Sequence, residues 1–316
     1  MSLTSAVRFI RRCFSLESLP KWPASTARPA IRVPDSQANP RSDKTPPRLK
    51  SFLEKTLTRA NPPLQALLAL LLLTACIPTP TPDLHVFAAA SLREALTETA
   101  DAFQRANPNV QVVSNLAGSQ VLRLQIESGA RADLFISANP HHLNALQHAG
   151  LLAAPPTVVA TNQLVLAVPA ANPAGITGLQ DLTQPSRRLV MAAQSVPAGA
   201  YARQMLALHA AATGQPGFAD AVLQHVISFE TNVRQVAAKL ELGEADAGFV
   251  YRTDVLASNG RLQVIEAPPR IQVTASYPAA VLRDAPNPEL ARRFLAYLNS
   301  PEAQAILTRH GFGPPA

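Results

Sequence analysis

Residues 84–91 read Leu-His-Val-Phe-Ala-Ala-Ala-Ser, an apolar run that ends in small residues and indicates the fold class. The run predicts a short buried strand over Leu84–Ala88, because a few apolar residues before a turn signal are typical of one. The small residues that follow predict a helix start, with Ser91 as the N-cap and Glu94 as the second half of a capping box. A strand that leads directly into a helix predicts an α/β sheet.

The same alternation continues to the end of the chain. Apolar runs predict further strands over Val110–Ser114, Leu134–Ala138, Leu164–Pro169, Leu189–Ala192, Val226–Phe229, Ala247–Tyr251, Leu262–Ile265 and Ser276–Leu282. Helical stretches are predicted over Ser91–Arg105, Ser119–Ser128, Pro140–Ala149, Ala200–Ala211, Phe218–His225, Asn232–Leu242, Pro288–Asn299 and Glu302–His310. Strands and helices interleaved at this spacing predict an α/β architecture with a parallel sheet.

Three later strand–helix junctions are also built from small or polar residues. They read Ala117-Gly118-Ser119-Gln120, Val196-Pro197-Ala198-Gly199 and Asn232-Val233. Any one such serine or asparagine is most often an ordinary helix cap. Four starts together favour a second interpretation, because converging helix N-termini leave backbone N–H groups open to an anion. These stretches contain no Lys or Arg, which favours an anion that is bound and released over one used in chemistry.

The charge is distributed unevenly along the chain. The whole sequence carries a net charge of +7, but residues 1–76 hold 12 basic and 4 acidic residues. Residues 77–316 therefore hold 16 basic and 17 acidic residues. A body this close to neutral excludes a polybasic surface for nucleic acid, and no nucleic-acid partner is predicted.

The front of the chain predicts a leader. Residues 1–54 are basic and rich in proline and predict a disordered extension. Residues 55–76 join a basic flank to an apolar run too short to span a bilayer, which is typical of a secretory signal. Because a signal normally begins a chain, one interpretation is that translation starts near Leu53 or Leu57.

The signal ends in Leu73-Thr74-Ala75-Cys76, which resembles the lipobox of bacterial lipoproteins. This resemblance implies that Cys76 is lipidated and begins the mature protein. The alternating prolines of residues 77–83 predict an extended linker. The alternative is a buried Cys76 at the end of a core helix. With a lipid anchor, the folded domain is expected outside the cytoplasm, in the periplasm or at the cell surface, tethered to a membrane.

The body resembles the molybdate-binding proteins of bacterial ABC importers. The matching stretches are Val86–Leu92, Gln125–Ala130 with Ala132–Ala138, Val196–Gly199 with Tyr201-Ala202, Asn232–Arg234, Gly248–Tyr251, Tyr277-Pro278 and Gly311-Phe312. The likeness covers Leu84–Phe312. It implies a periplasmic-binding-protein-like fold of two lobes, each a mainly parallel sheet flanked by helices, with two crossover strands as a hinge. It also implies a binding protein that is not an enzyme and needs no cofactor.

The resemblance implies which residues hold the oxyanion. Ser91 and Ser119 match the two serines that donate hydroxyls, Tyr251 matches a tyrosine hydroxyl, and Ala198 and Val233 match positions that donate through backbone N–H. No residue is implied as a direct metal ligand, since molybdenum would be bound as its oxyanion. The family often has a run of serines around the second position. Here Gly118 and Gln120 flank Ser119, which leaves the number of hydroxyl donors open.

The resemblance also implies how the parts are divided and used. Residues 84–162 with 276–316 are predicted to form lobe I and residues 163–275 lobe II, with crossings at Gln163–Val168 and Ala275–Val281. Molybdate or tungstate held between the lobes would stabilise the closed form, which an ABC permease in the membrane would recognise. The protein is expected to be a monomer.

Three other interpretations remain open. Within the binding proteins, the ligand is another oxyanion such as sulfate, or an organic anion. An α/β enzyme is a second interpretation, although the sequence has no Gly-x-Ser-x-Gly, no P-loop around Lys239 and no His-Glu-x-x-His. His141, His142 and His148 suggest a metal only weakly and are better explained as helix surface. A regulatory domain fused to a DNA-binding segment is the third.

Overall fold

The structure, a computed structural model, describes residues 83–315. The predicted extension (1–54), signal (55–76) and linker (77–83, except Asp83) lie outside the described residues, as does the predicted lipidation site at Cys76.

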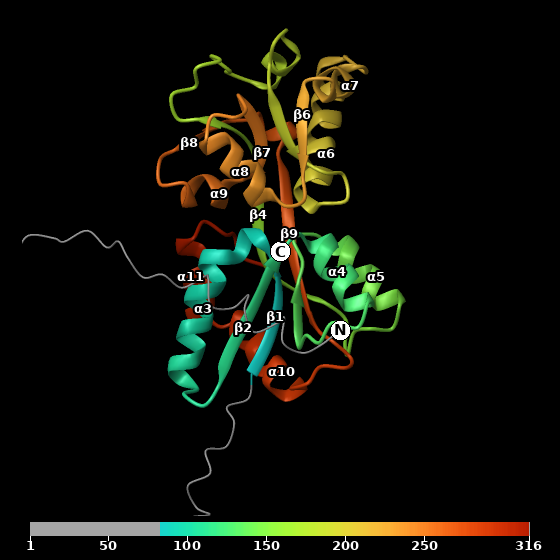
Figure 1. Cartoon of the computed structure of the whole chain (residues 1–316), viewed down its shortest axis with the longest axis vertical. Helices are drawn as coiled ribbons and strands as arrows, with labels where there is room; N and C mark the ends of the chain where they lie inside the picture. The colour runs from blue at the N-terminus through green and yellow to red at the C-terminus, as the bar shows by residue number, and fades with distance from the viewer. Residues whose placement is uncertain (1–82, 316) are drawn as a thin grey trace, which may run out of the picture. The chain divides into compact units, whose positions relative to one another are not determined.

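Strands and helices alternate along the described chain (Figure 1). The strands are β1 (Asp83–Ala89), β2 (Gln111–Ala117), β3 (Leu134–Ile136), β4 (Thr157–Pro169), β5 (Leu189–Ala192), β6 (Val226–Glu230), β7 (Ala247–Tyr251), β8 (Leu262–Ile265) and β9 (Val273–Val281). The α-helices are α3 (Arg93–Ala106), α4 (Ser119–Glu127), α5 (Pro140–His148), α6 (Pro197–Thr213), α7 (Phe218–Leu223), α8 (Val233–Glu241), α9 (Arg252–Ala257), α10 (Pro288–Leu298) and α11 (Pro301–Arg309). Short 3₁₀ helices are η2 (Ala90–Leu92), η3 (Leu179–Thr183) and η4 (Pro269–Ile271).

The described strands form one sheet in the order β2-β1-β3-β9-β4-β7-β5-β6, with β8 paired to β4. Parallel pairs join β1 to β2 and β3, and β5 to β6 and β7. The long strands β4 and β9 pair antiparallel with each other and with their neighbours. The sequence therefore predicted the parallel core of each half, and the antiparallel pairing arises where the chain crosses between halves.

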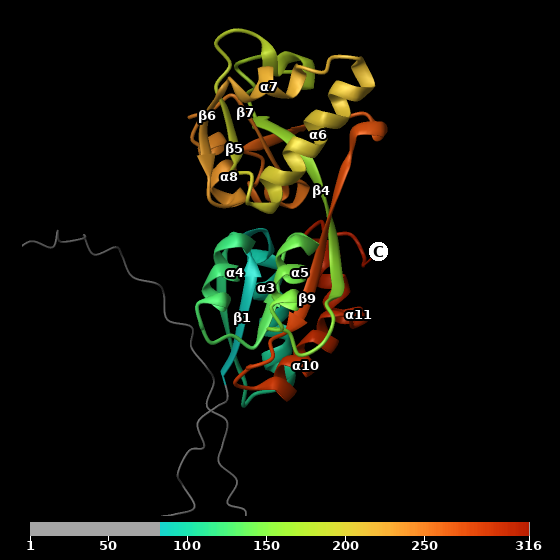
Figure 2. The same cartoon turned by 90° about the vertical axis from the view of Figure 1, so that its right-hand side faces the viewer.

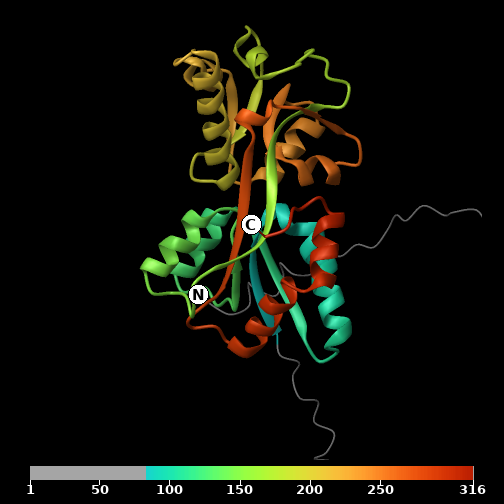
Figure 3. The ribbon, with the colours of Figure 1, turned by 180° about the vertical axis from the view of Figure 1, so that it is seen from behind.

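Two lobes lie at opposite ends of β4 and β9 (Figure 2). We call the lobe with β1–β3, α3–α5, α10 and α11 the first lobe, and the lobe with β5–β8 and α6–α9 the second. Seen from behind, β4 and β9 run side by side from one lobe to the other (Figure 3). The two-lobed fold is confirmed; the exact division at residues 162–163 and 275–276 stays a prediction.

Both sides of the first lobe's sheet are covered by helices. Helices α3, α10 and α11 pack together on one side, and α4 and α5 on the other (Figure 1). The second side has its own apolar cluster, which includes Phe87, Phe135 and Leu122. Within residues 83–315, none of the helices has the length and apolar character needed to cross a bilayer.

Most predicted elements are found within a few residues of their expected bounds, with three differences. Strand β4 begins at Thr157 and not Leu164, since polar residues in its first half hide the strand pattern. Strand β9 likewise begins at Val273 and not Ser276. Helix α9 was not predicted at all.

The predicted capping box at the first helix is wrong. Residues Ala90–Leu92 form a 3₁₀ turn, α3 begins only at Arg93, and no side chain caps either start. The Ser91 hydroxyl is buried and contacts Tyr277, while Glu94 pairs with Arg234 of the second lobe. Both side chains are therefore used by tertiary contacts in place of the local cap.

Candidate functional site

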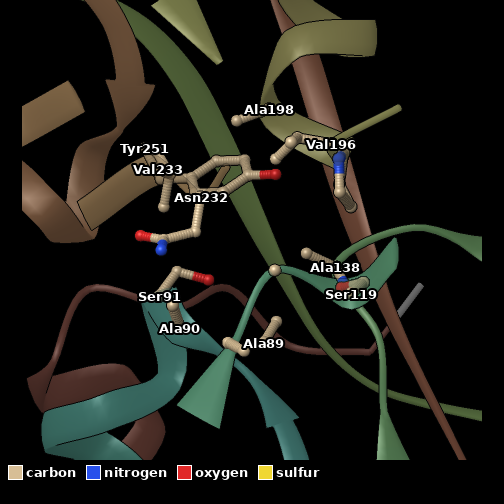
Figure 4. A pocket seen from close by; sticks show the side chains of 13 residues that line it. Ala89, Ala90, Ser91, Ser119, Ala138, Val196, Ala198, Asn232, Val233 and Tyr251 are labelled. Atoms are coloured by element: carbon tan, nitrogen blue, oxygen red, sulfur yellow. The ribbon is translucent and has the colours of Figure 1, made fainter. Parts of the chain in front are cut away.

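A pocket lies between the lobes where six strand–helix junctions meet (Figure 4). Its space between atoms is about 220 Å³, including space open to solvent. Thirteen residues line it: Ala89, Ala90, Ser91, Ala117, Gly118, Ser119, Ala138, Val196, Pro197, Ala198, Asn232, Val233 and Tyr251. All five residues that the sequence singles out as anion ligands are among them. None of the lining residues carries a charge.

Tyr251 brings a buried hydroxyl that has no partner. It is the last residue of β7, its side chain is 1% exposed, and Figure 4 shows the hydroxyl directed into the pocket. No protein group among the described residues hydrogen-bonds to Oη. Burial raises the pKa of this phenol well above its usual value, so the group stays an O–H donor. A buried polar atom left without a partner costs free energy, which a ligand acceptor would recover.

Ser119 is placed to donate as well. It is the first residue of α4 and is 1% exposed. Its Oγ accepts the backbone N–H of Ala138 at 3.1 Å, which leaves the hydroxyl proton free for another acceptor. Ser119 does not cap its own helix, since the N-cap residue is Gly118.

The flanking residues that depart from the serine run connect the two lobes. The Gln120 amide Nε2 donates to the backbone oxygen of Thr231 in the second lobe at 2.7 Å. A Cβ on Gly118 would lie 2.4 Å from that same oxygen, so a larger residue would push the lobes apart. Gly118 and Gln120 therefore take part in a contact between the lobes.

Ser91 lies on the 3₁₀ turn after β1 and is 2% exposed. Its Oγ is 2.8 Å from the hydroxyl oxygen of Tyr277 on β9. The sequence singled out Tyr277 only as part of a motif and not as part of the site. The available signal was a tyrosine directly before the apolar second half of the strand.

The remaining predicted donors are backbone groups at helix starts. Ala198 is in the first turn of α6, whose N-cap is Val196, and Val233 is the first residue of α8. The first N–H groups of a helix have no partner inside it and carry the positive end of its dipole. At α8 the Asn232 side-chain Oδ1 accepts from Gln235 at 3.2 Å. Its amide Nδ2 remains a further possible donor at the pocket wall.

A buried ion pair supports the pocket from behind Tyr251. The Asp254 carboxylate accepts the backbone N–H of Tyr251 at 2.9 Å and lies 3.0 Å from the Arg234 guanidinium. Burial raises the pKa of Asp254 to about 6, against the opposing effect of Arg234. Arg234 also pairs with Glu94 of the first lobe. One guanidinium thus links the backbone of Tyr251 to the opposite lobe.

The lining of the pocket supplies hydrogen-bond donors for an anion. The pocket offers hydroxyl and backbone donors, and no described side chain lining it is a carboxylate, imidazole, thiol or amine. Within residues 83–315, no group of three or more His, Cys, Asp or Glu side chains is placed to hold a metal ion. A set of donors without a base can hold an anion by its acceptor oxygens.

Known proteins resemble this chain over its whole described part. The molybdate-binding protein ModA of Mycobacterium tuberculosis is 37% identical over 232 residues, 73% of this chain and 84% of the relative. The solved substrate-binding domain of a putative molybdenum ABC transporter from Clostridium difficile is 30% identical, with a TM-score of 0.56, and covers 74% of this chain and 99% of that one.

A third similarity concerns the fold alone. The sulfate-binding protein SubI of Mycobacterium tuberculosis is 18% identical, with a TM-score of 0.68, over 73% of this chain and 86% of that one. The family described as bacterial extracellular solute-binding protein matches residues 84–313. The chain therefore belongs to the family of bacterial extracellular solute-binding proteins.

Proposed function

We propose that this protein binds molybdate, or the similar tungstate, between its lobes and delivers it to an ABC permease without chemical change. The observation that carries the proposal is the buried, unpartnered Tyr251 hydroxyl in an uncharged pocket of donors. The named binding specificity of the 37% identical relative supports the same ligand.

The chemistry of the pocket fits a fully ionised tetrahedral anion. Such a dianion presents only acceptors at neutral pH, and Ser91, Ser119, Tyr251 and the N–H groups of Ala198 and Val233 present donors. A hydrogen bond to a charged group contributes about 1.5–3 kcal/mol, so several are needed to offset the lost hydration of the ion. A protonated oxyanion would direct an O–H at a donor and be disfavoured.

Closure of the lobes follows from the division of these donors. Ser91 and Ser119 belong to the first lobe, and Ala198, Val233 and Tyr251 to the second. Only the closed form completes the donor set, so the anion stabilises that form. The permease would then recognise the closed protein. Lipidation of Cys76 would hold a monomeric domain outside the cytoplasm, close to that permease.

Sulfate is the second candidate, because a sulfate-binding protein shares the fold with a TM-score of 0.68. Sulfate and molybdate have the same charge and shape and differ in size, so donor chemistry alone does not separate them.

Isothermal titration of the purified full chain with molybdate, tungstate, sulfate and phosphate tests the proposal. We expect tight binding of molybdate and tungstate, weak or no binding of sulfate, and none of phosphate, which keeps a proton at neutral pH. Heat with sulfate but not molybdate would overturn the choice of ligand. Absence of binding by every oxyanion would overturn the function itself.

A further inference from the structure

We propose that Asn162 and Tyr277 form a hydrogen-bond relay in the hinge that holds the Ser91 hydroxyl as a donor toward the bound anion. The inference rests on the proposed function and assigns positioning roles to two residues that do not line the pocket. Asn162 is on β4 and Tyr277 on β9, the two strands that cross between the lobes.

The direction of the relay follows from the groups at its ends. The Asn162 Oδ1 accepts the backbone N–H of Gln163 at 2.9 Å, and a backbone N–H can only donate. The side-chain amide is therefore oriented with Nδ2 toward its other neighbours. Nδ2 donates to the Thr253 hydroxyl oxygen at 2.9 Å and, over a longer 3.4 Å, to the Tyr277 hydroxyl oxygen.

The orientation of the Asn162 amide also sets the direction of the hydrogen bond between Tyr277 and Ser91. Because Nδ2 has no lone pair to offer, the Tyr277 proton cannot point toward Asn162 and is available to the Ser91 Oγ, 2.8 Å away. Tyr277 is fully buried, and burial raises the pKa of its phenol, so the proton stays on the oxygen. Tyr277 then occupies one of the two lone pairs of the Ser91 Oγ, and the Ser91 proton is not used on Tyr277 and stays available to the pocket.

The relay also accounts for the burial of polar groups inside the hinge. Asn162 and Thr253 are each 4% exposed, and Thr253 belongs to the second lobe, next to the Arg252 that begins α9. The hydrogen bonds thus connect Ser91 of the first lobe, the hinge strands β4 and β9, and Thr253 of the second lobe. A Ser91 hydroxyl without this support would be free to present either its proton or its lone pairs.

Three variants of the full chain, titrated with molybdate at pH 8, separate polarity from mere packing. Tyr277→Phe removes the relay and should weaken binding about 3- to 10-fold, since Ser91 can still donate when it rotates. Asn162→Asp should reverse the relay, because an ionised carboxylate accepts from Tyr277, which then accepts from Ser91. Ser91 would direct lone pairs at the anion, and binding should fall by about 100-fold or more. The Gln163 N–H and the Thr253 hydroxyl can both donate to the new carboxylate, which favours its ionised form at pH 8.

The double variant Asn162→Asp/Tyr277→Phe decides the question. It keeps the added carboxylate but lacks the Tyr277 hydroxyl that would connect this carboxylate to Ser91. The relay therefore predicts tighter molybdate binding than in Asn162→Asp alone, by about 3-fold or more. A purely structural role predicts losses that add, with the double variant the weakest binder, and that result would overturn the relay. Unchanged affinity in Tyr277→Phe would overturn it as well.

Controls keep the outcomes distinct. Tyr297→Phe removes a buried tyrosine hydroxyl on α10, away from the pocket, and should leave the affinity unchanged. If Asn162→Asp does not fold, the ratio of affinities for molybdate and the monoanion perrhenate still tests Tyr277→Phe. We expect the ratio of the molybdate affinity to the perrhenate affinity to fall in Tyr277→Phe. A Ser91 hydroxyl that is not held as a donor discriminates less in favour of the dianion. An unchanged ratio would reject the relay. A wild-type protein that binds no molybdate would contradict the proposed function and not the relay.

Discussion

At the scale of single residues, the hydroxyls of Tyr251 and Ser119 are held in different ways. Tyr251 has no protein partner in the described chain, whereas Ser119 already accepts a buried backbone N–H from Ala138. From sequence alone, loss of either hydroxyl should weaken binding and leave the empty protein about equally stable. The structure changes this expectation for Ser119.

Tyr251→Phe should weaken molybdate binding by about tenfold or more, because it removes one hydrogen bond to a charged ligand. The thermal midpoint of the empty protein should stay the same or rise slightly, since no internal hydrogen bond is lost. Titration and thermal unfolding of the same sample check both parts. A large drop in the midpoint would mean that the hydroxyl supports the fold.

Ser119→Ala should weaken binding and also destabilise the empty protein. The Ala138 N–H would lose its acceptor inside a buried site, at a cost of about 1–3 kcal/mol. Denaturant unfolding without ligand measures this free energy. Stability equal to that of wild type would show that water or another acceptor replaces the Ser119 oxygen.

At the scale of elements, the start of α6 depends on a close approach to the end of β5. A Cβ added to Gly199 would lie 2.1 Å from the backbone oxygen of Ala193 and 2.3 Å from that of Ala192. The helix therefore packs directly on the strand end, which fixes the Ala198 N–H at the pocket. The sequence predicts that the small residues of this junction leave backbone N–H groups accessible to a ligand. The same small residues also permit the close packing of α6 on β5.

Gly199→Ala should displace the first turn of α6, lower the unfolding free energy by about 1–3 kcal/mol and weaken molybdate binding. Gly217→Ala is the matched control, because a Cβ there meets nothing within 4 Å. Unfolding and titration of both variants check the prediction. Equal effects of the two substitutions would contradict it.

At the scale of the whole molecule, the lobes are joined by the hinge strands and by side-chain contacts beside the pocket. Gln120 reaches Thr231, and Arg234 reaches Glu94 while also pairing with Asp254. The Arg234–Glu94 pair between the lobes is partly exposed, so it stabilises the closed arrangement only modestly. The ligand can therefore still decide between open and closed forms.

Glu94→Gln should loosen the closed form and weaken molybdate binding by up to about 5-fold, mainly through faster dissociation, as expected for a partly exposed ion pair. Glu266→Gln breaks a comparable pair with Arg252 inside the second lobe and should leave affinity unchanged. Stopped-flow dissociation rates check both. The same rate in both variants would show that the pair between the lobes does not contribute to closure.

The response of stability to acid should depend on His142. His142 is 2% exposed, so its interpretation as helix surface is wrong. This burial, and then the charges of His141 and Arg123, lower its pKa to about 4 from the usual 6.5. The folded state therefore favours neutral His142, and the stabilisation present above pH 6.5 is lost as the pH falls toward 4. His142→Gln should flatten this loss in thermal midpoints measured from pH 7 to 4.5, while the exposed control His148→Gln should not. Parallel curves for His142→Gln and wild type would contradict the assignment.

The amino-acid sequence predicts the order of the strands and of the described α-helices except α9, and four of the junctions that line the pocket, because periodicity and helix-start residues are local signals. It did not determine the polar halves of β4 and β9, where strand structure comes from pairing across the hinge. It also assigned Ser91 and Glu94 to a local cap. The folded chain instead places Tyr277, 186 positions away, against Ser91, and Arg234, 140 positions away, against Glu94. Contacts between residues so far apart in the chain leave no periodic pattern in a single sequence. They orient the pocket donors, whose residue types alone could be predicted from the sequence.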